Sequence, residues 1–136
     1  MSTKSVRALC QRPLIEVRPR DTLRAVARSL ADASVGVAVV SRSHRLGEAA
    51  RVDGLISERD VIVALADGAD PDEVRAEDVM ADDLASASPD WSLHEAARHM
   101  LDHEIRHLPV TADGTVVGIV SMRDALRSEL DATADC

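Results

Sequence analysis

Two short stretches decide how this chain is organised: GLISERD at residues 54–60 and GIVSMRD at residues 118–124. Each begins with apolar residues that suit a strand and reaches a serine that can cap a following helix. Unpaired backbone N–H groups at a helix start favour an anion such as phosphate, and the aspartate three residues after the serine could hold a ribose hydroxyl. The same Ser-x-x-Asp spacing is also a capping box that binds nothing. Taken alone, each stretch leaves both interpretations open.

The two stretches belong to an internal duplication. A shift of 70 residues aligns Pro19 with Pro89, and after the second strand the shift becomes 64, because Asp60 aligns with Asp124. The first copy therefore carries six extra residues, which we place in the loop at residues 41–51. A repeat of this length indicates one supersecondary unit that occurs twice.

Local signals predict the same elements in each copy. The first copy is expected to form a strand at 15–17, a helix capped by Thr22, a hairpin of 37–40 with 52–56, and a helix at 58–66. The second is expected to form a strand at 84–87, a helix capped by Ser92, a hairpin of 108–111 with 115–120 across an Asp-Gly turn, and a helix from 122 to about 130.

The predicted fold class is therefore α+β, with two tandem β-α-β-β-α repeats. We divide the chain into repeat one at 6–68, a linker at 69–76 and repeat two at 77–131. A single repeat of about sixty residues would be marginally stable alone. We therefore expect the repeats to pack sheet to sheet with pseudo-two-fold symmetry.

Composition narrows the class of protein. The 136 residues include 16 basic and 24 acidic side chains, a net charge of -8, which disfavours nucleic acid and anionic membranes as partners. The two cysteines, Cys10 and Cys136, form no ligand-like cluster and are expected to be free thiols. No apolar run is long enough for a signal peptide or a membrane span, so we expect a cytoplasmic protein.

The duplicated unit, together with IRHLPV at residues 105–110 and the paired G-[LI]-[IV]-S-x-x-D stretches, resembles a tandem pair of cystathionine-β-synthase (CBS) domains. The likeness covers roughly residues 6 to 130. It implies a regulatory module, not an enzyme, that binds adenosine-containing ligands such as AMP, ADP, ATP, S-adenosylmethionine or NAD in clefts between the repeats. It also implies a homodimer that signals to an effector protein, with an adenine nucleotide as regulatory ligand and no other cofactor.

The resemblance also assigns roles to residues. In the family the serine at the helix start contacts phosphate, the later aspartate holds the ribose, and a strand ending in proline lines the adenine. The nucleotide-binding residues that this implies are Arg106, His107, Leu108, Pro109, Ser121, Arg123 and Asp124 in copy two, and Val37, Ala38, Ser57, Arg59 and Asp60 in copy one. Copy one departs from the pattern, because Val39 stands where copy two has Pro109. We therefore expect the second site to bind more tightly.

Two other chemistries are weaker interpretations. His99, His103 and His107 recur every four residues, but the repeat alignment places His107 in a strand, and two imidazoles do not complete a four-ligand zinc site. A hydrolase could use Ser121, His107 and Asp124, but the chain lacks a G-x-S-x-G nucleophile elbow. We assign no catalytic and no metal residues.

A rival function from another class is a ligand-free structural or interaction module, in which the Ser-x-x-Asp stretches act only as helix caps. The single aromatic residue, Trp91, also has two interpretations. It could pack as a hydrophobic staple onto Ala96, or it could anchor a dimer interface.

Overall fold

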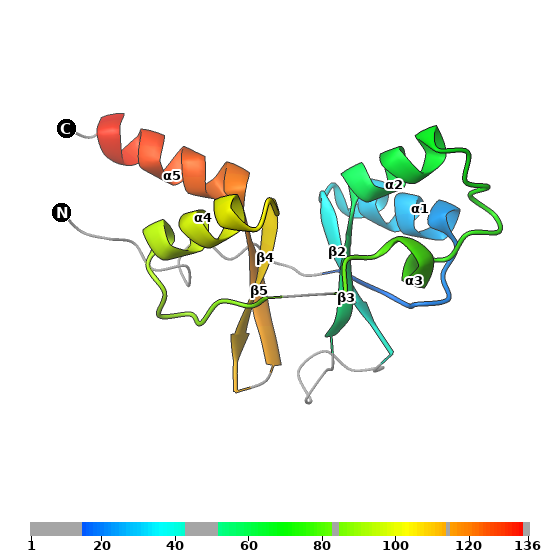
Figure 1. Ribbon diagram of the computed structural model, residues 1–136, viewed down its shortest axis with the longest axis horizontal. Coiled ribbons are helices and arrows are strands. Elements are labelled where there is room, and N and C mark those ends of the chain that lie inside the picture. The colour runs from blue at the N-terminus through cyan, green and yellow to red at the C-terminus, as the bar shows by residue number, and fades with distance from the viewer. Residues whose placement is uncertain (1–14, 43–51, 83–84, 114, 135–136) are drawn as a thin grey trace. The chain divides into compact units, whose positions relative to one another are not determined.

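The computed structural model describes residues 15–42, 52–82, 85–113 and 115–134 (Figure 1). Most of the 41–51 loop, both cysteines, Leu84 and Gly114 lie outside these ranges. The chain forms two compact units, one containing the first repeat and the other the second. Each repeat combines helices with a small sheet, which confirms the predicted α+β class. The sheet-to-sheet packing of the repeats stays a prediction.

The unit of repeat one contains a three-stranded sheet and three helices. Its elements are β1 (Glu16–Val17), α1 (Leu23–Ala33), β2 (Val37–Ser41), β3 (Val52–Ser57), α2 (Glu58–Ala66) and α3 (Ala76–Val79). The strand order is β1-β2-β3, with β1 parallel and β3 antiparallel to β2. The predicted strand, helix, hairpin and helix of this repeat are all confirmed within one or two residues.

The first helix shows how local sequence positions these elements. The Thr22 hydroxyl accepts a hydrogen bond from the Ala25 N–H at 3.2 Å, so it caps α1 as predicted. Leu23, Val26 and Leu30 recur at helical spacing, and all three are buried against the sheet. The helix face is therefore core, and it holds β2 and β3 in place.

Repeat two has the same order of elements. They are α4 (Leu93–Asp102), β4 (His107–Ala112), β5 (Thr115–Ser121) and α5 (Met122–Ala134). The predicted strand at 84–87 is reduced, within the part that the structure describes, to a single parallel bridge between Ala87 and Val110. Asp113 has φ of 54°, and Ala112 pairs with Thr115, as expected for the two-residue hairpin. No helix among the described residues is long and apolar enough to cross a membrane.

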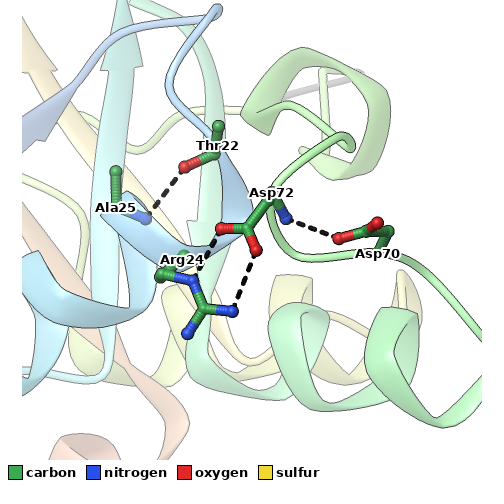
Figure 2. Close-up of polar contacts among 5 residues, drawn as sticks. All are labelled: Thr22, Arg24, Ala25, Asp70 and Asp72. Carbon is green, nitrogen blue, oxygen red and sulfur yellow. Dashed lines mark hydrogen bonds and ion pairs between the residues drawn. The ribbon is translucent and has the colours of Figure 1, made fainter.

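Residues 70–82 pack on the unit of repeat one. The N–H groups of Leu23 and Arg24 donate to the carbonyl groups of Val74 and Pro71, both at 3.0 Å. The Arg24 guanidinium also pairs with the Asp72 carboxylate through two hydrogen bonds, of 2.6 and 3.1 Å (Figure 2). This segment therefore fastens to the start of α1.

The same segment adds a short extension to β3. Leu55 and Ala81 exchange two backbone hydrogen bonds, of 3.0 and 2.9 Å. A Cβ atom on the neighbouring Gly54 would lie 2.7 Å from the Met80 sulfur and 2.8 Å from the Ala81 carbonyl oxygen. Only glycine fits this close approach. The division into repeats with a linker at 69–76 stays a sequence-based proposal. The hydrogen bonds between Leu55 and Ala81 show that residues up to 81 contact repeat one.

Candidate functional site

Each repeat brings its predicted site residues together where the hairpin meets the closing helix. We call residues 36–39 with 57–60 corner one, and residues 106–109 with 121–124 corner two. In corner one Val37 pairs with Ser57 across the hairpin, and in corner two His107 pairs with Ser121. The predicted adenine strand and the predicted phosphate serine therefore lie side by side within each repeat.

The backbone closes both corners in the same way. The first N–H of α2, from Glu58, donates to the Gly36 carbonyl oxygen at 2.9 Å. The first N–H of α5, from Met122, donates to the Arg106 carbonyl oxygen at 2.8 Å. Each helix thus has one of its unpaired N–H groups satisfied by the residue just before a strand.

The serines cap the two helices as the sequence predicted. The Ser57 hydroxyl accepts from the Asp60 N–H at 3.1 Å, and the Ser121 hydroxyl accepts from the Asp124 N–H at 3.0 Å. In corner one the box is complete, because the Ser57 N–H donates to the Asp60 carboxylate at 2.8 Å. A serine that accepts in this way keeps its own proton to donate to a ligand. Capping and ligand binding are therefore compatible at these residues.

The predicted adenine residues divide into two groups. Ala38 and Leu108 are fully buried, and each belongs to the apolar core of its own repeat. Strand alternation places Val37 and His107 on the opposite face of the sheet. Because the side chains of Ala38 and Leu108 are buried in the core, a ligand at either corner would contact only the backbone of these residues.

The predicted arginines, unlike the buried strand residues, are exposed to solvent. Arg59, Arg106 and Arg123 are exposed, each beside a helix start. Their guanidinium groups can supply positive charge to a bound phosphate.

Sequence reasoning missed a charged group at corner one. The Glu58 side chain lies along Gly36, and a Cβ atom on that glycine would be 3.4 Å from its Oε1 atom. The corresponding residues of corner two are Met122 and Arg106. The 64-residue shift already aligns Glu58 with Met122, so a comparison of charge at this position would have found the difference.

The formal charges of the corners consequently have opposite sign. In corner one Glu58 and Asp60 outweigh Arg59 by one charge. In corner two Arg106 and Arg123 outweigh Asp124 by one.

The predicted histidine pair lies at the end of α4. The rings of His99 and His103 stack with their centroids 4.1 Å apart, and His103 Nδ1 lies 3.0 Å from the His99 carbonyl oxygen. His103 is exposed and His99 is half-buried. His107 lies in β4, as predicted. In the described part of the chain, no three potential metal ligands are grouped.

Trp91 packs against the apolar core of repeat two, which includes Ala96. Its ring also meets the His99 ring edge to face, with centroids 5.7 Å apart. This position fits the staple interpretation, because the residue before an N-cap reaches the first turns of the helix.

Of the residues considered for a hydrolase, Ser121 and Asp124 meet as a helix cap, because the Ser121 hydroxyl accepts the Asp124 N–H at 3.0 Å. His107 pairs with Ser121 across the hairpin.

The CBS domain model matches residues 6–67 and 76–131 of the chain. The chain belongs to the CBS domain family. An uncharacterized 17.7 kDa protein of Acidianus ambivalens is 33% identical over 96% of this chain and 76% of its own length. An uncharacterized protein of Methanopyrus kandleri is 32% identical over 95% of this chain, which spans 64% of that longer protein.

Solved structures are similar to this CBS protein over nearly its whole length. A CBS domain protein from Pyrobaculum aerophilum, complexed with AMP, is 31% identical with a TM-score of 0.78, covering 95% of this chain and 99% of that one. The CBS domain pair of a protein in complex with 5′-methylthioadenosine and S-adenosyl-L-methionine is 22% identical with a TM-score of 0.82, covering 96% and 99%. The second likeness concerns the fold alone.

Proposed function

We propose that this protein is a regulatory module that senses adenosine-containing ligands at its two corners. The observation that carries the proposal is the repeated corner, in which a capped helix start faces the strand residues that the family uses for the adenine. The AMP complex of the Pyrobaculum relative supports the ligand class. The bound ligand would change the contacts that the module offers to an effector protein.

In this proposal the serines donate to the 5′ substituent of the ligand, which in a nucleotide is phosphate, and the aspartates accept from the ribose. Ser57 and Ser121 each keep a hydroxyl proton for the ligand, since the oxygen already accepts a backbone N–H. Hydrogen bonds to a charged acceptor are the stronger kind, so Asp60 and Asp124 would supply much of the ribose affinity. No catalytic step is needed, and the compartment that we propose is the cytoplasm.

Thermal unfolding against a ligand panel tests the proposal. A ligand at one hundred times its dissociation constant should stabilise the protein by about 2.7 kcal/mol. AMP, ADP, ATP, S-adenosylmethionine and NAD form the panel, with inosine monophosphate as the control for adenine recognition. A flat response to every adenosine compound, confirmed by calorimetry, would contradict it.

One observation favours a second candidate, a ligand-free interaction module. In corner one the capping box is complete, so Ser57 and Asp60 have a structural role that requires no ligand. This candidate predicts that the panel has no effect, whereas an effector protein still binds.

We also propose that the protein is a homodimer formed through its closing helices. α2 exposes Ile62, Val63 and Leu65, and α5 exposes Leu126 and Leu130 at 58% and 70%. Ile62 and Leu126 occupy matching positions of the two repeats. Exposed apolar residues at matching places suit a self-complementary interface with a second copy.

Substitutions on these helices test the dimer. Ile62→Glu and Leu126→Glu should each shift the protein to a monomer in light scattering, because a buried carboxylate opposes association. Leu101→Glu on α4 is the matched control, since Leu101 is 67% exposed but lies outside the closing helices. A monomeric parent protein, with or without AMP, would refute the homodimer.

A further inference from the structure

We infer that the two corners select different adenosyl ligands. Corner one takes those whose 5′ substituent carries no negative charge, and corner two takes those that carry phosphate. This inference rests on the proposed function, because it assigns a ligand class to each of the same two corners. It follows from the contact between Glu58 and Gly36, which has no acidic counterpart in repeat two.

The Glu58 carboxylate lies beside the place where a 5′ substituent would bind. Glu58 directly follows Ser57, and its Oε1 atom lies against Gly36, the residue before the paired position Val37. Among the described residues no cation lies within ion-pair distance of Glu58. Its negative charge therefore has no fixed counter-ion in the described part of the chain, and it repels a phosphate at the corner.

Corner two has the reverse chemistry at the same two positions. Met122 replaces the glutamate and carries no charge, and the exposed Arg106 replaces the glycine. Arg123 adds a second guanidinium at the helix start. Guanidinium groups recognise phosphate through paired N–H donors, so this corner favours the phosphorylated ligand.

The backbone does not account for the difference. Both helices have their first N–H satisfied by the carbonyl of the residue before a strand and their third by the serine hydroxyl, with lengths that agree within 0.1 Å. The helix-start contribution to anion binding is therefore similar in the two corners. The selectivity between charged and uncharged ligands must therefore come from the residues that differ, at positions 58 and 122 and at positions 36 and 106.

Residue-resolved NMR titration of the full chain tests this inference. AMP and adenosine serve as probes, and the amide signals of Ser57 and Asp60 report on corner one while those of Ser121 and Asp124 report on corner two. In the parent protein adenosine should be the tighter ligand at corner one, and AMP the tighter ligand at corner two.

Reciprocal variants isolate the charge. Glu58→Gln should tighten AMP binding at corner one by about threefold to tenfold and leave adenosine binding unchanged, as expected for one unit charge near a solvent-exposed site. Met122→Glu should weaken AMP at corner two by a similar factor. High salt should reduce both effects. Glu73→Gln, which removes a negative charge from the 70–74 turn, is the matched control and should change neither ratio.

The outcomes separate this inference from the proposed function. If both probes bind and Glu58→Gln leaves the ratio of AMP to adenosine affinity at corner one unchanged, the inference is overturned and the sensing function stands. Shifts confined to corner two also overturn it. If neither probe perturbs either corner, the proposed function itself fails, and the inference fails with it.

Discussion

The two corners of this CBS protein share a backbone and differ in charge. In each, the carbonyl of the residue before a strand and a serine hydroxyl accept N–H groups of the helix start, at distances between 2.8 and 3.1 Å. The residues that differ most are Gly36 and Glu58 in corner one, and Arg106 and Met122 in corner two. All four residues take part in the hydrogen bonds common to both corners through their backbone atoms alone. A duplicated fold can therefore change its ligand chemistry at these positions without changing its geometry.

The repeats also differ in how the first helix is fastened. Arg24 in the first turn of α1 pairs with Asp72, whereas the corresponding residue of α4 is the exposed His94. Repeat one carries residues 70–82 along α1 and β3, where Leu55 pairs with Ala81. Stability and binding can therefore be perturbed separately in the two repeats.

The ribose contact at corner two should give the largest difference between the corners. Asp124→Asn is expected to weaken AMP binding by about 1.5 to 3 kcal/mol, because a charged acceptor is lost, and to leave the apo protein nearly as stable. Asp60→Asn should weaken AMP binding less. Calorimetry on both variants measures this, and equal losses would remove the asymmetry while leaving the family assignment intact.

The close packing at Gly54 should give the next largest effect, this time on stability. Gly54→Ala forces a Cβ to within 2.8 Å of the Ala81 carbonyl oxygen, so we expect a loss of about 1 to 3 kcal/mol in urea unfolding. Gly36→Ala is the control in the same unit, because its Cβ would meet Glu58 at 3.4 Å and the glutamate can move. Equal stability of the two variants would show that residues 80 and 81 can move away from the added Cβ atom at little cost in free energy.

Much of this fold could be predicted because its signals are local and occur twice. The caps Thr22 and Ser92, the Asp113 turn and the apolar spacing of α1 and α4 each act within a few residues. Alignment of the two copies then showed that helix caps and apolar helix spacing recur at matching positions. Of the strand predicted at 84–87, the described residues 85–87 form only a bridge between Ala87 and Val110, which depends on tertiary placement.

Contacts between distant residues could not be predicted in this way. Arg24 and Asp72 are 48 positions apart, and no periodic pattern connects them. The position of Glu58 beside Gly36 depends on the pairing of β2 with β3. The net charge of the sequence does not reveal this pairing. The Ser-x-x-Asp spacing predicted the cap correctly, but the same spacing suits a ligand site, so the ribose role of Asp60 and Asp124 stays a prediction.

Removing the capping box at corner one should have a smaller effect than the Gly54 substitution. Asp60→Ala leaves the Ser57 N–H without its 2.8 Å acceptor, and loss of a cap typically costs about 0.5 to 2 kcal/mol of apo stability. Chemical unfolding without ligand measures this loss. An unchanged midpoint would mean that the aspartate contributes nothing to the fold, which would strengthen its assignment to the ribose.

The ion pair that fastens α1 should give the smallest effect, and one that depends on pH. The hydrogen bond from Arg24 lowers the pKa of the Asp72 carboxyl below its usual 3.8, although desolvation opposes the shift. Because the folded pKa is the lower one, the stabilisation is fully present above about pH 4 and is lost as pH falls through the folded value. Both side chains are well exposed, so salt should weaken the contribution further. Asp72→Asn should therefore be slightly less stable than the parent protein in urea unfolding at pH 6, and the difference should shrink toward zero below pH 4. A difference that stays constant with pH would show that the ion pair is not its cause, because the Asp72 N–H that donates to Asp70 is retained in the variant.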